Sequence, residues 1–186
     1  FRLMEEAFQT ERYKEELKIA KTVQKSLLPT SLESAPDFEI SAFAESADEV
    51  GGDYYDTLRI NDHQVALIIA DVSGKGTTAA FHMSQMFCLE RGSFISATYF
   101  VVDSVTKTIR YSRAGHCPVL YFKAREGTTG YLKDKGTALG MVRSKDYCKL
   151  VETNEINYAP GDIMVLYTDG ITEAKNKEFE DFGEQR

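Results

Sequence analysis

Cysteine is scarce in this sequence of 186 residues, and the few cysteines present are not paired. Cys88, Cys117 and Cys148 are widely spaced and form no CxxC pair, which excludes a disulfide framework and a zinc knuckle. We expect each of them to be a small buried or half-buried residue in a reducing compartment.

Long apolar runs and a basic surface are also lacking. No apolar stretch approaches the ~20 residues that cross a bilayer, and no signal-peptide pattern opens the chain. We therefore expect a cytoplasmic protein without direct membrane insertion. The formal net charge of -7 argues against nucleic acid as a partner, because no basic stripe is available to displace counterions. The chain opens at Phe1 inside a helical pattern, so we expect a domain of a longer protein.

Two common hydrolase signatures are missing. A P-loop would need glycine at position 69 and serine or threonine at position 76, where this sequence has Ile69 and Gly76. Ser73 lacks a nucleophile elbow, and no Ser-His-Asp order is legible. His116, in a tight turn, is interpreted as a structural hydrogen-bonding residue. These absences argue against a nucleotide-hydrolysing enzyme and against a covalent hydrolase.

A long helix is predicted from about Glu5 to Leu28, because this stretch has no glycine or proline and Pro29 ends it. Two apolar rows run along it: one with Tyr13, Leu17, Ala20, Gln24 and Leu27, and one with Ile19, Val23 and Leu27. The helix either lies on its own domain or is a dimerising linker from an upstream sensor. We therefore divide the chain into a linker helix, residues 1–28, and a domain, residues 29–186.

The rest of the chain has mainly the pattern of short strands, with a single predicted helix. Apolar runs typical of strands buried on both faces, alternating segments and short meandering strands follow one another. This order predicts an α+β fold with antiparallel sheets and helices packed outside. The segment Phe87–Cys88 joins a helix to a strand abruptly, so we expect residues to be absent there. The predicted strands are Phe38 to Ala44, Gln64 to Asp71, Ala97 to Asp103, Thr108 to Ala114, Val119 to Lys123, Tyr147 to Ile156 and Ile163 to Thr168, and the predicted helix is Thr77 to Phe87.

Carboxylates stand at the ends of the two most apolar strands. QVALIIA runs into Asp71 and IMVLYT into Asp169, each just before a glycine-containing turn. Asp53 and Asp56 follow the glycine pair of VGGDYYD, where the backbone can approach closely. Mg²⁺ and Mn²⁺ choose oxygen ligands of this kind, usually one or two carboxylates plus waters. Since aspartate before glycine is also a common turn pair, spacing alone leaves both interpretations open.

Six blocks occur in the order found in a known family: AKTVQKSLLP, EVGGDYYD, IADVSGKGTTAA, RAGHCPVLYF, GTALGM and PGDIMVLYTDGITEA. From about Ala20 onward the chain resembles bacterial PPM-type (type 2C-like) serine/threonine phosphatases of the RsbU/SpoIIE branch. The resemblance implies a β-sandwich of two mainly antiparallel sheets flanked by helices, with an N-terminal linker helix. It also implies two divalent metal ions, Mn²⁺ or Mg²⁺, at one end of the sandwich.

The resemblance also implies roles for single residues. Asp53 and Asp71 would be metal ligands, with Asp71 bridging both ions; Val72 would offer its backbone carbonyl, and Asp169 would hold one ion. The implied substrate is a phosphorylated anti-anti-sigma protein, whose dephosphorylation releases a sigma factor in bacterial partner switching. The helix ending in LLP would connect to an upstream sensor domain, and we expect a homodimer through it.

Two features depart from the family pattern. That branch continues past YTDG with further helix and a strand carrying a late Asp-Asp pair, one of which binds metal, whereas this sequence ends at Arg186. The branch also has a longer helical region at Phe87–Cys88. We therefore expect the domain to be incomplete at its C-terminus. The alternative hypothesis is a catalytically weak or inactive, pseudophosphatase-like dimer that docks a partner.

Overall fold

The computed structural model describes residues 2–46, 50–73, 93–142 and 144–184. The predicted helix over Thr77 to Phe87 and the Phe87–Cys88 join lie outside these residues. In chain order the elements are α1 (Arg2–Leu27), β1 (Asp53–Arg59), β2 (Gln64–Val72), β3 (Ile95–Asp103), β4 (Thr108–Ala114), β5 (Val119–Lys123), β6 (Thr128–Leu132), α3 (Ser144–Tyr147), β7 (Thr153–Asn157), β8 (Ile163–Val165) and α4 (Asp169–Thr172).

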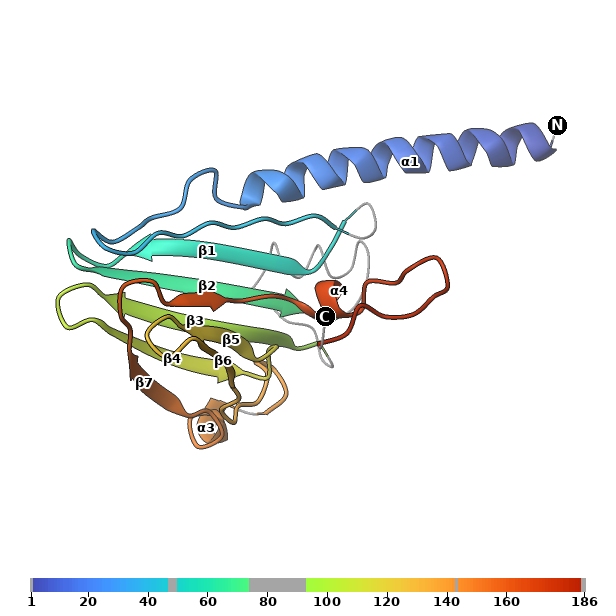
Figure 1. Ribbon diagram of the computed structural model, residues 1–186. Helices are drawn as coiled ribbons and strands as arrows, with labels where there is room; N and C mark the ends of the chain where they lie inside the picture. Colours follow the sequence, from blue (N-terminus) through green and yellow to red (C-terminus); the bar gives the residue numbers. More distant parts are fainter. Residues whose placement is uncertain (1, 47–49, 74–92, 143, 185–186) are drawn as a thin grey trace.

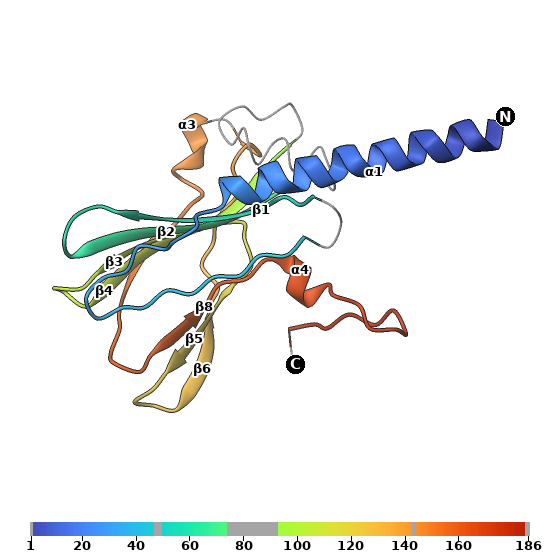
Figure 2. The ribbon, with the colours of Figure 1, turned by 90° about the horizontal axis from the view of Figure 1, so that it is seen from above.

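The strands form two antiparallel sheets that face each other (Figures 1 and 2). The larger sheet has the order β1-β2-β3-β4-β7 and the smaller has β6-β5-β8. Consecutive strands pair mostly with each other, because short hairpin turns join antiparallel neighbours without a crossover. The predicted antiparallel sandwich with an N-terminal helix is therefore confirmed.

The inner face of the larger sheet packs against the smaller sheet. Leu67 of β2 lies opposite Phe100 of β3, which lies opposite Tyr111 of β4. Phe100 and Tyr111 stack with ring centroids 5.6 Å apart and join Val119 of β5 in one buried cluster. Since side chains alternate between faces, every second residue of these strands belongs to this inter-sheet core.

The outer face of the larger sheet is covered by helix ends. A second cluster of Ala70, Val72 and Ile95 packs against Leu28, directly after α1, and Tyr147, the last residue of α3. Only the C-terminal part of α1 lies on this face, and the rest projects past the sandwich in both views (Figures 1 and 2). With 26 residues the helix is about 39 Å long. It ends before Pro29, as predicted.

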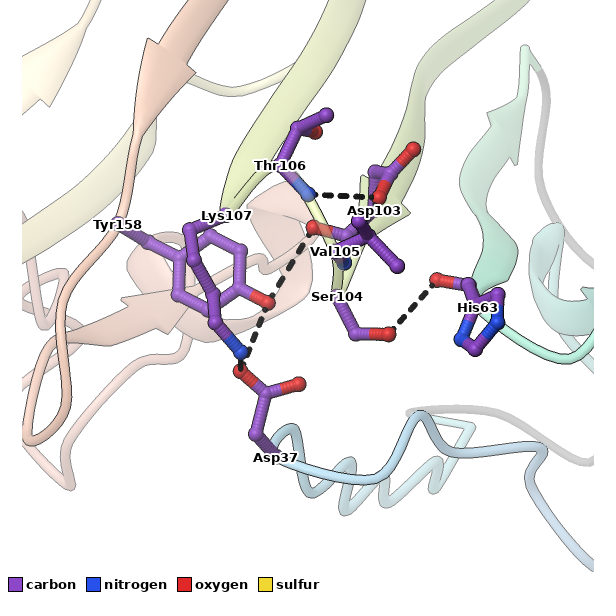
Figure 3. A network of polar contacts seen from close by, with 8 residues as sticks. All are labelled: Asp37, His63, Asp103, Ser104, Val105, Thr106, Lys107 and Tyr158. Carbon is purple, nitrogen blue, oxygen red and sulfur yellow. Dashed lines mark hydrogen bonds and ion pairs between the residues drawn. The ribbon is translucent and has the colours of Figure 1, made fainter.

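A polar network fastens the chain after α1 to the far end of the sandwich (Figure 3). Asp37 pairs with Lys107 and accepts a hydrogen bond of 3.1 Å from the Tyr158 hydroxyl. Asp103 accepts the backbone N–H groups of Val105 and Thr106 at 2.9 and 3.0 Å, which shapes the turn between β3 and β4. The network therefore organises the end of the sheets that bears no predicted site residue.

Three strand predictions were wrong in whole or in part. Residues 39–46 form no strand: Phe38 only bridges to Ala35, and Phe43 is 86% exposed. The stretch Tyr147 to Ile156 divides into the end of α3, a turn and the shorter strand β7. In both places local alternation suggested a strand, but pairing with a neighbour decides whether one forms.

The third error concerns Ile163 to Thr168. Only Ile163–Val165 pairs with β5, at the edge of the smaller sheet, and Ile163 and Val165 are exposed. A run without polar residues does not reveal whether its strand is central or at an edge. The strands from Gln64 to Lys123 match the prediction closely, whereas β1 and β6 were not predicted.

Other expectations had mixed outcomes. Cys117 is half-buried as expected, Cys148 is exposed, and Cys88 lies outside the described residues. Gln24, placed by the sequence in an apolar seam of α1, is instead buried against the protein's own domain. None of the helices in the described part of the chain is both long and apolar enough to cross a membrane.

The turn at Asp103 gives a pH prediction. Hydrogen bonds from the Thr106 backbone, the Gln64 amide and the Val105 backbone lower the pKa of Asp103 from 3.8 to about 2. A depressed carboxyl pKa stabilises the fold above pH 4 and loses that effect as the pH falls toward 2. Asp103→Asn should lower the urea midpoint at pH 7 and approach the unaltered protein near pH 2. Asp62→Asn, in the exposed β1–β2 turn, is the control; equal effects of both variants would contradict the prediction.

Candidate functional site

Two predicted aspartates face each other across the first strand pair. In the antiparallel register of β1 and β2, Asp53 lies directly opposite Asp71. Asp71 shares the face of Leu67, so both carboxylates lie on the inner face of the larger sheet, where the sandwich opens. Carboxylates directly opposite one another repel, so the pair needs a compensating interaction.

The third aspartate arrives from the smaller sheet. After β8 the chain turns at Thr168 into α4, whose first residue is Asp169. The Thr168 hydroxyl occupies the N-cap position but makes no cap hydrogen bond; it donates to Asp53 Oδ2 at 3.1 Å. This hydrogen bond ties the start of β1 to the end of the smaller sheet.

The electrostatics confirm that the three carboxylates are close neighbours. Burial, followed by the charges of Asp53, Asp169 and Glu173, raises the pKa of Asp71 to about 7. Burial and the charge of Asp169 also raise the pKa of Asp53, against the opposing effect of the Thr168 hydrogen bond. The site therefore concentrates negative charge that a cation would relieve.

Gly52 leaves room for this charge cluster. A Cβ atom at Gly52 would stand 2.7 Å from the Val72 carbonyl oxygen and 2.9 Å from Asp71 Oδ1. Both oxygens thus border the same small space, and only glycine keeps it open. The Gly52 carbonyl accepts the Val72 N–H at 3.3 Å, which holds the two backbones at this separation.

These donors fit a hard divalent cation. Carboxylate and carbonyl oxygens are the ligands that Mg²⁺ and Mn²⁺ prefer. Within the described ranges, no group of three or more His, Cys, Asp or Glu residues is arranged tightly enough to hold a metal. The donor set is therefore wider than a closed cage, as suits Mg²⁺, which is bound by one or two carboxylates and keeps several waters.

His116 lies beneath the carboxylates rather than among them. Its ring is buried, and Nδ1 lies 2.7 Å from the hydroxyl of Ser96, the residue opposite Asp71 on β3. Burial lowers the pKa of His116 to about 4, although the charge of Asp169 and the nearby Tyr167 backbone oppose this. In the part of the chain described, Nε2 has no hydrogen-bond partner of normal geometry. The neutral ring supports the site from below, in keeping with its structural interpretation.

Asp56, the fourth predicted carboxylate, is not part of the site. Three residues after Asp53 on the same strand, it points to the opposite face of the sheet. There it accepts hydrogen bonds from the Tyr54 hydroxyl at 3.0 Å and the Thr57 backbone at 2.7 Å. The turn Gly74-Lys75-Gly76, considered as an anion site, lies outside the described residues.

The sequence analysis overlooked three residues that matter here. Thr168 anchors Asp53, Glu173 adds negative charge near Asp71, and Gln24 contacts the Gly51 backbone beside Asp53. Thr168 carried a usable signal, because it directly precedes Asp169 at a helix start, where a hydroxyl is preferred. Glu173 and Gln24 reach the site only through folding.

Comparison with known proteins now places the chain. The sequence profile described as Stage II sporulation protein E (SpoIIE) matches residues 87–186, more than half of the chain. The chain belongs to the SpoIIE family. RsbU of Bacillus subtilis, named as a phosphoserine phosphatase, is 28% identical over 190 residues, covering 88% of this chain and 55% of RsbU.

Solved structures support the fold of this SpoIIE-family chain. The SiaA-PP2C domain of Pseudomonas aeruginosa matches with a TM-score of 0.70 at 16% identity, covering 95% of this chain and 80% of that domain. RsbX, solved in complex with magnesium, matches with a TM-score of 0.52 at 14% identity, covering 69% of this chain and 71% of RsbX. The chain spans about half the length or less of the curated relatives it matches, 34% to 55%.

The space beside Gly52 gives a prediction that needs no metal. Gly52→Ala should lower the free energy of unfolding by about 1–3 kcal/mol, because the added methyl group would displace Val72 or Asp71. Gly130→Ala on β6 is the matched control: nothing lies within 4 Å of its Cβ position, and its effect should stay within about 0.5 kcal/mol. Urea denaturation of both variants measures the difference, and equal stabilities would contradict the assigned packing.

Proposed function

We propose that this chain is a Mn²⁺- or Mg²⁺-dependent phosphatase that hydrolyses phosphoserine or phosphothreonine on a partner protein. The observation that carries the proposal is the meeting of Asp53, Asp71 and Asp169 at one end of the sandwich, where burial and mutual repulsion raise the pKa of Asp71 to about 7. Membership of the SpoIIE family and the similarity to RsbU support the same activity.

The proposed ligands follow from the donor set. Asp53 and Asp71 would hold the two cations, with Asp71 bridging them, the Val72 carbonyl completing one side and Asp169 holding one ion. Bound cations would neutralise the phosphate oxygens and activate a water, so no protein nucleophile is required. The magnesium complex of RsbX supports a divalent ion in this fold.

The chain's own residues have preparatory tasks in this proposal. Thr168 turns the Asp53 carboxylate toward Asp71 through its hydrogen bond. Gly52 keeps the Asp71 and Val72 oxygens accessible from one side. The inter-sheet core behind them fixes the strands, so that the carboxylates need little reorganisation when charge develops on the phosphate.

The proposed physiological substrate is a phosphorylated anti-anti-sigma protein of bacterial partner switching, met in the cytoplasm. The resemblance of the sequence blocks to the RsbU/SpoIIE branch supports this choice. An upstream sensor domain would act through α1, much of which projects from the sandwich (Figure 1).

A second candidate is a docking module without turnover. It is favoured by the absence, within the described ranges, of a tight group of three metal-binding side chains. The two candidates differ in phosphate release, since a docking module would bind the phosphorylated partner and leave it unchanged.

The enzyme hypothesis predicts a specific loss at Asp71. Phosphate release from a phosphoserine peptide should need Mn²⁺ or Mg²⁺ and stop with a chelator. Asp71→Asn should reduce it by more than the roughly 10–100-fold typical of residues behind metal ligands. Asp56→Asn, on the opposite face of β1, is the control and should retain most activity. Turnover that survives both the chelator and Asp71→Asn would exclude the proposed site.

We also propose a homodimer through α1. Ile19, Val23 and Leu27 are 65%, 57% and 43% exposed and lie on adjacent turns of one helix face. Burying this row against a second copy would remove apolar surface from water. Light scattering at high concentration should find a dimer, and Val23→Glu should shift it toward monomer, whereas the exposed Lys18→Glu should not. A strictly monomeric unaltered protein would contradict this prediction.

A further inference from the structure

Gln24 is a buried amide on the last docked turn of α1. Its residue is 9% exposed, although its neighbours Val23 and Lys25 are exposed. Its side chain grips one peptide unit from both sides: Oε1 accepts the Gly51 N–H at 3.0 Å, and Nε2 donates to the Gly51 carbonyl. A buried amide with both ends satisfied fixes position, because a shift would leave polar groups unpaired.

The gripped residue lies two positions before Asp53. Gly51 and Gly52 form a pair without side chains, and such a pair has more backbone freedom than any other dipeptide. Its position must therefore come from external contacts. Gln24 supplies them on one side, and the hydrogen bond between Gly52 and Val72 supplies one on the other.

A small cavity of about 20 Å³ lies at this junction. Gln24 and Leu28 line it from the helix side, and Gly51 and Asp53 line it from the strand side. The helix and the proposed ligand therefore share one packing environment. Displacement of the helix end would be felt at the start of β1, because well-packed contacts transmit small shifts.

Other contacts of the helix end are weaker. Lys21 and Lys25 pair with Glu45 at 3.2 and 3.5 Å, but these groups are exposed, and such pairs contribute little. Leu28 adds apolar packing on the outer face of the sheet. Of these contacts, the Gln24 amide is the one that touches the backbone leading into the site.

We propose that Gln24 is a positioning residue that holds Gly51 and Gly52 so that Asp53 faces Asp71 at the cation site. The affinity of the site for a divalent cation then depends on how α1 is seated. This inference rests on the proposed function, because it requires that Asp53 binds a cation.

The test compares matched substitutions along one helix. Gln24→Glu replaces the donating amide by an oxygen that faces the Gly51 carbonyl, and Gln24→Met keeps the length but removes both hydrogen bonds. Gln9→Glu makes the same chemical change on the exposed part of α1 and serves as the control. Mn²⁺ is titrated into each 186-residue protein by calorimetry, and urea unfolding is followed without metal.

We expect Gln24→Glu and Gln24→Met to weaken Mn²⁺ binding about tenfold or more, the effect typical of residues that orient metal ligands. Gln9→Glu should leave the affinity unchanged. If Gln24→Glu fails to fold, Gln24→Met gives the same comparison. A lower urea midpoint with unchanged Mn²⁺ affinity would reduce Gln24 to a helix-docking contact and overturn the inference alone. Absence of Mn²⁺ binding by the unaltered protein would overturn the proposed function as well.

Discussion

The antiparallel pairing of β1 with β2 sets two aspartates directly against each other at the open end of the sandwich. This arrangement is unfavourable by itself, because two like charges share a partly buried position, and the raised pKa of Asp71 records the cost. Much of the local structure makes sense as a response to that charge: a glycine where a methyl group would close the space, a threonine that holds one carboxylate, and a neutral histidine below.

The site depends on four separate stretches of chain that meet because the sandwich brings them together. β1 and β2 deliver Asp53 and Asp71 from the larger sheet, the segment after β8 delivers Thr168 and Asp169 from the smaller one, and α1 reaches in with Gln24. The inter-sheet core holds the first three in place. The helix is different, since its contact with the site region is a polar grip rather than a broad apolar surface. That difference makes the helix the element best suited to change position without unfolding the sandwich.

The sequence predicted some elements well and others poorly, for identifiable reasons. β2 to β5 were found because their apolar residues are continuous and short turns separate them, so local pattern and final pairing agree. Phe38 to Ala44 alternates equally well, yet it does not pair beyond a single bridge, and Phe43 is exposed. Ile163 to Thr168 has no charged residue, yet only three residues pair, at a sheet edge. Gln24 looked like an interruption of an apolar seam, and its function as a buried ligand of Gly51 depends on a contact 27 positions away.

By itself the sequence determined the alternation that makes the strands, the glycine pair before Asp53, the helix end at Pro29 and the ordered blocks that identify the family. These are local properties, dictated by side-chain period and backbone freedom. Only the tertiary structure decided that Asp56 leaves the site while Thr168 joins it, that the aspartates raise one another's proton affinity, and that α1 grips Gly51. Register and packing between distant segments settle these points, because electrostatic and hydrogen-bond partners are chosen by distance in space, which residue spacing along the chain does not specify.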